Sequence, residues 1–285
     1  MTETDVEKWT KAIVHLECQG YSTPEREGGR QVQSYGTGLL VNDAGVDYLV
    51  TARHVVHDPH PAIDGTFPGA ESLNSQQVFS YIVAVPEFGV DPATRTFPAA
   101  MMNLSAGSLD SRPYLMSAPD YDLAVIDLSD ERSSFIGNLI TAGKVPVALS
   151  DVATSLPPLG EPVTAFGYPA SVSNMAAPPL HPAEAAWHAH AQSLPTVSWG
   201  HVANRHPDVA RFWADISIYP GNSGGPLVAG NQMVGVVCAQ ALVEGNRVPF
   251  ANVVQSQLVR MMIDELKLKT AKAQALRDGW ESWRS

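Results

Sequence analysis

The sequence is short of cysteine and of long apolar runs. Only Cys18 and Cys238 occur in 285 residues, so the chain can form at most one disulfide. Secreted proteins often carry several disulfides. No apolar stretch reaches the roughly 20 residues that a membrane-spanning helix needs. The acidic, polar N-terminus lacks the apolar core of a signal peptide. We therefore expect a cytoplasmic protein with both thiols reduced.

Positive charge is also scarce, because 18 Lys and Arg face 29 Asp and Glu and leave a net charge of −11. This balance disfavours nucleic acids and anionic membrane surfaces as partners. The remaining composition is that of a globular protein, with 45% hydrophobic and 16% charged residues. The 22 Gly and 22 Pro predict many turns, as in an all-β protein with short strands.

The stretch that carries chemistry is Gly221-Asn222-Ser223-Gly224-Gly225-Pro226, which lies between two apolar, strand-like runs. Glycines on both sides of a serine leave room for a substrate carbonyl and allow positive φ. The backbone N–H groups of Gly221 and Ser223 can then converge on a developing oxyanion. The alternative is a Gly/Pro-rich hairpin whose serine has no catalytic role.

This hexapeptide resembles the nucleophile loop of trypsin-like (chymotrypsin-fold) serine proteases, in the bacterial form with Asn before the serine. Two further segments are similar to the same family. Thr51-Ala52-Arg53-His54 follows a Gly-Thr-Gly hairpin, and Asp122-Leu123-Ala124-Val125 begins an apolar run. The resemblance implies a triad in the order His54, Asp122, Ser223, with Gly221 and Ser223 as the oxyanion hole.

Other residues compete for two of these roles. His57 and His60 lie close to His54, in a Pro-rich segment that we expect to be an exposed loop. Asp120 would share a face with Asp122 on an extended chain, and Asp127 follows the apolar run.

The resemblance also implies an all-β fold of two six-stranded antiparallel barrels with a C-terminal α-helix. We expect residues 1–145 to form the first barrel, with a long inserted region at 57–113, and residues 146–255 to form the second. Residues 256–285 are expected to be the helix and tail. Within the first barrel, residues 9–18 and 78–85 read as strands.

Substrate binding is less well specified by the sequence. By alignment with the family, Ser217 falls near the floor of the primary specificity pocket, where an acid would favour Arg or Lys. Asp215 is two residues away and stays an alternative. The backbone of Cys238, Ala239 and Gln240 is expected to pair with an extended substrate strand. Three histidines, His181, His188 and His190, lack the spacing of a metal site, so neither metal nor cofactor is expected.

Together these observations predict a serine endopeptidase that acts on protein or peptide substrates. Asn222 stands where processed relatives carry Asp, so we expect no zymogen cleavage and consider regulation by loop order or by a protein partner. The main alternative is a catalytically idle trypsin-like module that binds a partner. An α/β-hydrolase is excluded because the serine motif is not Gly-x-Ser-x-Gly and the histidine precedes the serine.

Overall fold

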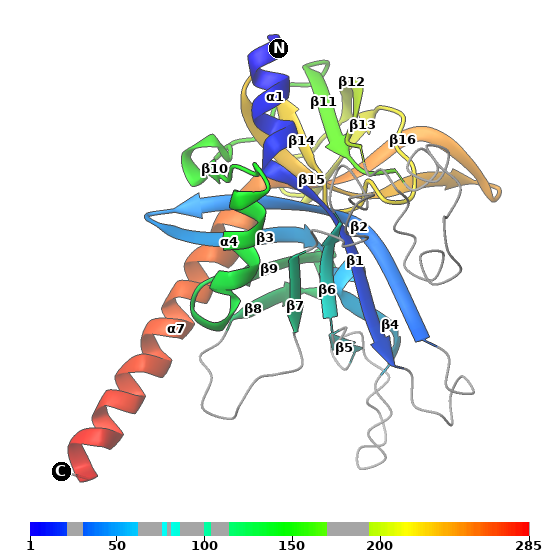
Figure 1. Cartoon of the computed structure of the whole chain (residues 1–285). Helices are drawn as coiled ribbons and strands as arrows, with labels where there is room; N and C mark the ends of the chain where they lie inside the picture. The colour runs from blue at the N-terminus through cyan, green and yellow to red at the C-terminus, as the bar shows by residue number, and fades with distance from the viewer. Residues whose placement is uncertain are drawn as a thin grey trace.

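The computed structural model describes residues 1–21, 31–61, 76–78, 81–85, 100–103, 114–169 and 194–284. Two β-structures lie one against the other, with helices at their edges (Figure 1). The fold class is the one that the sequence predicts, a mostly β, chymotrypsin-like protein with a C-terminal helix. The described strands of the first half form an open sheet, not a closed barrel.

The first β-structure is an eight-stranded sheet in the order β7-β6-β1-β2-β3-β9-β8, with β10 paired to β2. Its strands are β1 Ile13–Tyr21, β2 Gln31–Asp43, β3 Val46–Ala52, β6 Tyr81–Val85, β7 Ala100–Asn103, β8 Leu115–Ala118, β9 Leu123–Asp127 and β10 Val147–Ala148. A separate pair, β4 His57–Pro61 and β5 Gln76–Val78, follows the candidate histidine. The segment from His57, which we expected to be a loop, thus begins as a strand.

The second β-structure is a closed barrel in the order β11-β12-β13-β16-β15-β14. Its strands are β11 Pro162–Gly167, β12 Thr196–Asn204, β13 Arg211–Asp215, β14 Pro226–Ala229, β15 Gln232–Val243 and β16 Asn246–Gln255. Alternate residues of these strands, such as Val163, Ala214 and Val253, are buried inside the barrel. The core of the first sheet extends to the second half through residues such as Tyr168 and Val236, so apolar packing joins the two structures.

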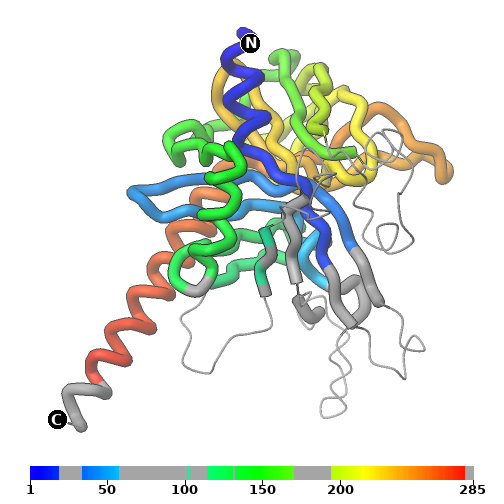
Figure 2. Tube along the Cα trace, viewed as in Figure 1, coloured from blue at the N-terminus to red at the C-terminus, as the bar shows by residue number. Residues whose placement is uncertain are grey.

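Helix α1, Glu3–Ala12, replaces the first part of the strand that we predicted over residues 9–18. Thr2 caps it, since its hydroxyl accepts from the Asp5 N–H while the Asp5 carboxylate accepts from the Thr2 N–H. Trp9 is fully buried, and its Nε1–H donates to Asn231 Oδ1 at 3.3 Å. These contacts fix the N-terminal helix against the second barrel (Figure 2).

Three further helices lie in the described residues. The single turn α3, Arg53–Val56, confirms the predicted helical turn at His54. Helix α4, Ser133–Thr141, was not expected from the sequence. Helix α7, Ser256–Arg284, includes the expected C-terminal helix; Val259, Ile263 and Leu266 of its first half are buried in the core, and its C-terminal end extends away from the β-structures (Figure 1). None of the described helices is long and apolar enough to cross a membrane. Short 3-10 turns lie at η2 Pro119–Tyr121, η3 Asp130–Arg132 and η4 Leu149–Asp151.

Candidate functional site

His54 and Asp122 meet because they follow and precede two paired strands. Ala52, the last residue of β3, is the register partner of Leu123, the first residue of β9. His54 therefore lies two residues after Ala52 and Asp122 lies one residue before Leu123, at the same end of the strand pair. The antiparallel pairing thus joins two segments that are 68 residues apart in the chain.

Asp122 holds the histidine through two hydrogen bonds. His54 Nδ1 lies 2.7 Å from Asp122 Oδ2, and the backbone N–H of His54 donates to Oδ1 at 2.9 Å. A carboxylate only accepts hydrogen bonds, so Nδ1 carries the proton and Nε2 is the acceptor nitrogen of the neutral ring. A third bond, from the Arg53 N–H to the backbone oxygen of Asp122 at 3.0 Å, fixes the main chain of the acid.

The backbone of Asp122 is left-handed, with a φ of 54° and a ψ of 45° at the end of η2. Non-glycine residues rarely adopt this conformation, and Asp and Asn tolerate it best because of their short polar side chains. The turn directs the carboxylate to His54. Asp120, the competing acid, is exposed, and its backbone oxygen accepts from Arg211. Asp127 instead accepts from the backbone N–H of Ser129, at 2.9 Å.

Two buried side chains lie behind this pair, and sequence analysis missed both. Arg53 is 5% exposed and His57 is 4% exposed, so the expectation that His57 is a solvent histidine is wrong. Burial, together with the Arg53 charge, lowers the pKa of His57 to about 4, and the ring is neutral at physiological pH. Burial also lowers the pKa of Arg53, which the Asp122 charge opposes. His60 has no described side chain.

Ser223 lies in the tight turn that precedes β14. Gly221 and Gly224 flank it with φ of 101° and 90°, which side-chain-bearing residues rarely adopt. The N–H of Gly224 donates to Val237 O at 2.7 Å, and the N–H of Gly225 donates to Asn222 O at 2.9 Å. In the described part of the chain, the N–H groups of Gly221 and Ser223 donate no hydrogen bond.

Thr37 holds this turn from the first sheet. Its N–H donates to Ser223 O at 2.8 Å, and its hydroxyl donates to Gly221 O at 2.7 Å. The same hydroxyl accepts from the Tyr168 N–H at 3.0 Å, and Thr37 is fully buried. The sequence offered a signal for this role of Thr37, because it is the only residue with a side chain in the segment Gly36-Thr37-Gly38.

Cys238 connects the serine to the acid. Ser223 Oγ donates to the backbone oxygen of Cys238 at 3.1 Å, and Cys238 Sγ donates to the backbone oxygen of Asp122 at 3.6 Å. Among the described residues, no hydrogen bond joins Ser223 to His54. Burial and, to a smaller extent, Asp122 raise the pKa of the Cys238 thiol, so the thiol is neutral beside the serine.

The predicted substrate-binding residues lie at two places. Cys238, Ala239 and Gln240 are on β15, next to Ser223. Ser217 is exposed and lines a pocket on the outer wall of the barrel, together with Asp215. None of the three β15 residues lines that pocket. In the described residues, no group of three or more His, Cys, Asp or Glu could hold a metal ion. His181, His188 and His190 lie outside the described residues.

A closed six-stranded barrel packed against a second β-sheet, followed by a helix, is a chymotrypsin-like architecture. A family model for the trypsin-like peptidase domain matches residues 36–236, which is more than half of the chain. The chain therefore belongs to the trypsin-like peptidase family. A comparison with curated proteins found no match.

Proposed function

We propose that this peptidase domain is a serine endopeptidase that hydrolyses peptide bonds through an acyl-enzyme. Ser223 Oγ attacks the scissile carbonyl carbon while His54 Nε2 takes the hydroxyl proton. The C–N bond then breaks and His54 gives that proton to the leaving amine. Water attacks the resulting ester with His54 again as the base, which releases the acid product and regenerates Ser223. Asp122 keeps the proton on Nδ1 and stabilises the imidazolium.

The observation that carries this proposal is the contact of 2.7 Å between His54 Nδ1 and Asp122 Oδ2. It fixes the tautomer in which Nε2 can act as a base. The second bond, from the His54 N–H to the same carboxylate, restricts rotation of the acid. A base that is oriented by a third group is the arrangement that nucleophilic catalysis by serine requires.

The backbone of the nucleophile turn supports an oxyanion hole at Gly221 and Ser223. Their N–H groups have no acceptor among the described residues, and Thr37 fixes the carbonyls on both sides of the turn. Donors that are held in place before reaction stabilise the tetrahedral oxyanion without reorganisation, and each contributes about 10²–10³ in kcat.

The resting position of the Ser223 hydroxyl is the one observation that favours the idle module. The hydroxyl donates to Cys238 O and makes no described bond to His54. A rotation about χ1 changes the acceptor of a serine hydroxyl, and catalytic hydrogen bonds are often loose before substrate binds. We therefore rank the endopeptidase first.

Substrate would bind along β15. One edge of β15 pairs with β16 along its length. The other edge pairs with β14 and, through the Val237 N–H, with Gly225 O; after Val237 no described strand pairs with this second edge. The other edge, at Cys238, Ala239 and Gln240, starts beside Ser223 and can accept an extended peptide as an added strand. Ser217 and Asp215 both line the pocket on the outer wall of the barrel, so neither places an acid beside Ser223. We therefore propose apolar side chains before the scissile bond in preference to Arg or Lys.

Activation without N-terminal cleavage is part of the proposal. Asn222 is 4% exposed, and its Oδ1 has no hydrogen-bond partner among the described residues. An amide carries no charge that would pair with a new N-terminal ammonium.

The proposal is tested by mapping cleavage sites in a denatured proteome and in casein, with the wild-type chain and with Ser223→Ala. We expect cleavage by the unprocessed wild-type chain and its loss, by at least about 10³-fold, in the variant. Intact mass spectrometry of the active sample should show the complete N-terminus. Equal cleavage by both proteins would refute the role of Ser223 in hydrolysis. Activity confined to an N-terminally trimmed chain would refute activation without cleavage.

A further inference from the structure

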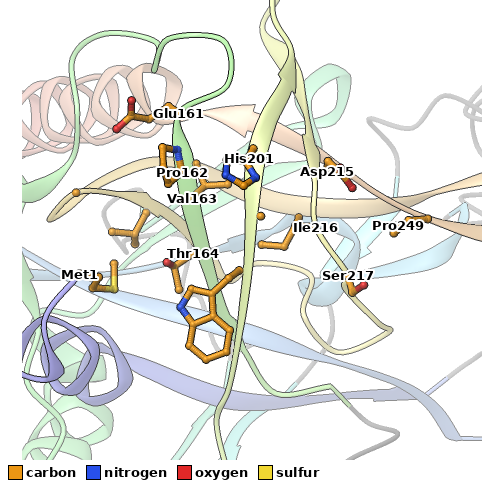
Figure 3. A pocket seen from close by; sticks show the side chains of 14 residues that line it. Met1, Glu161, Pro162, Val163, Thr164, His201, Asp215, Ile216, Ser217 and Pro249 are labelled. Atoms are coloured by element: carbon orange, nitrogen blue, oxygen red, sulfur yellow. The ribbon is translucent and has the colours of Figure 1, made fainter.

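A pocket of about 670 Å³ lies on the outer wall of the second barrel (Figure 3). Two rows of cross-strand partners form its floor. Pro162, His201 and Asp215 are register partners on β11, β12 and β13. Thr164 is likewise paired with Trp199 and with Val228.

This wall faces the outside of the barrel, because the strand residues that alternate with the pocket positions point into the barrel core. Val163, Val202 and Ala214 are all buried in the second core cluster. In a strand, neighbouring side chains point to opposite faces, so Thr164, His201 and the indole of Trp199 face outwards. Neither His54, Asp122 nor Ser223 lines the pocket.

Two side chains in the pocket lack the contacts that such groups normally make. Trp199 is 70% exposed although its indole has a large apolar surface. Thr164 is only 5% exposed, lines the pocket, and makes no hydrogen bond through its hydroxyl within the described chain. Figure 3 shows this side chain between Val163 and Met1. The Thr164 hydroxyl is not among the described buried polar atoms that lack a partner, so it is open to the pocket and can bond to a ligand there.

The charge of the pocket is negative. Glu161 and Asp215 line it, and in the described part of the chain neither carboxylate takes part in an ion pair. No lysine or arginine is among the residues that line it. Met1, which carries the α-ammonium of the chain, does line it, so one positive group opposes the two carboxylates. An exposed indole with carboxylates nearby is a favourable setting for a cation, because the ring face and the carboxylates attract the same charge.

We propose that this pocket binds a basic side chain of a peptide segment, with arginine preferred to lysine. The guanidinium would stack on Trp199, pair with Glu161 or Asp215, and donate to the hydroxyl of Thr164. Arginine suits the site better than lysine because its planar group stacks on an aromatic ring and donates in several directions at once. The site is independent of the proposed catalysis. It would recruit a partner or a distant part of a substrate.

The experiment uses the full chain with Ser223→Ala, so that no peptide is cleaved. Isothermal titration compares acetyl-tetraarginine amide with the neutral isostere acetyl-tetracitrulline amide. We expect the arginine peptide to bind with an affinity that falls as salt rises, and the citrulline peptide to bind at least about tenfold more weakly. Equal binding of the two peptides, or no binding of either, would overturn the proposal.

Variants place the binding in this pocket. Trp199→Ala should weaken the arginine peptide about fivefold, and the double variant Glu161→Gln, Asp215→Asn should weaken it about tenfold. Asp264→Asn is the matched control, an exposed acid on α7 that should leave binding unchanged. Thermal unfolding checks that each variant is folded. An unchanged affinity in both pocket variants, or a loss in the control equal to theirs, would mean that the peptide binds elsewhere by general charge.

Discussion

The backbone N–H of Thr37 donates to the carbonyl oxygen of Ser223 at 2.8 Å, across the boundary between the first sheet and the second barrel. The hydroxyl of the same residue donates to Gly221 O at 2.7 Å. One buried residue of β2 therefore holds both sides of the nucleophile turn. The position of Ser223 relative to His54 depends on this link, because His54 belongs to the first sheet and Ser223 to the barrel.

Thr37→Val keeps the shape of the side chain and removes its hydroxyl. Gly221 O and the Tyr168 N–H then lose their partner in a buried place, and we expect a loss of stability of about 1–3 kcal/mol. A shift of the turn would lower kcat/KM by up to about 100-fold. Chemical denaturation and peptide hydrolysis measure the two effects.

Thr196→Val is the matched control for this change. Its hydroxyl donates to Gly167 O at 3.2 Å and makes no described hydrogen bond to the nucleophile turn. We expect it to keep nearly full kcat/KM. Equal losses of activity in the two variants would argue against a special role for Thr37.

Gly224 and Gly230 provide a comparison of two glycines with positive φ, 90° and 59°. A Cβ at Gly224 would overlap Thr37 O and Thr51 Oγ1, whereas a Cβ at Gly230 would meet nothing within 4 Å. Gly230→Ala should cost only the strain of a left-handed alanine, about 1 kcal/mol. Gly224→Ala should cost several times more and abolish hydrolysis. A melting temperature lowered equally by both would contradict this reading of the turn.

Asp122→Asn separates catalysis from folding. Asparagine tolerates the left-handed backbone of this position, so the fold should be kept. The amide allows the wrong tautomer of His54, and kcat should fall by about 10³–10⁴. Asp120→Asn, an exposed acid two residues earlier, should change kcat less than about twofold. Full activity of Asp122→Asn would remove the acid from the proposed triad.

Glu17 should make stability depend on pH. It is 4% exposed on β1, and burial raises its pKa from 4.5 to about 8. Between these values the unfolded chain loses the proton and the folded chain keeps it. The free energy of unfolding should therefore fall as pH rises, by up to about 1.4 kcal/mol per pH unit.

Urea unfolding of the wild type and of Glu17→Gln from about pH 5.5 to about pH 7.5 measures this slope. The variant should show the smaller decline and be the more stable protein at the higher pH. Glu244→Gln, in an exposed turn, is the control and should keep the wild-type slope. A wild-type slope in Glu17→Gln would show that Glu17 does not titrate as proposed.

The sequence was sufficient to predict the fold class and the meeting of His54 with Asp122, because each candidate residue adjoins a readable strand. The strands that bring them together contain short apolar runs, residues 48–50 in β3 and residues 123–126 in β9. Helix α1 was missed because the segment from Trp9 reads as a strand, whereas its helical start depends on the cap between Thr2 and Asp5.

Buried polar contacts were beyond the reach of sequence patterns. His57 looks exposed in a Pro-rich segment, yet packing covers it and its Nδ1 lies 3.2 Å from Arg53 O. The link from Ser223 through Cys238 to Asp122 joins three distant segments, and no local pattern encodes it. The pocket at Trp199 likewise arises from cross-strand neighbours on four strands and from the N-terminal residue.

The most direct test of the central claim is active-site labelling with a fluorophosphonate, followed by peptide mapping. The account predicts one adduct, on Ser223, in the folded wild-type chain, and none in His54→Ala or in the heat-unfolded chain. A folded wild-type protein that takes no label on Ser223, or a His54→Ala variant that is labelled there as fast as wild type, would contradict it.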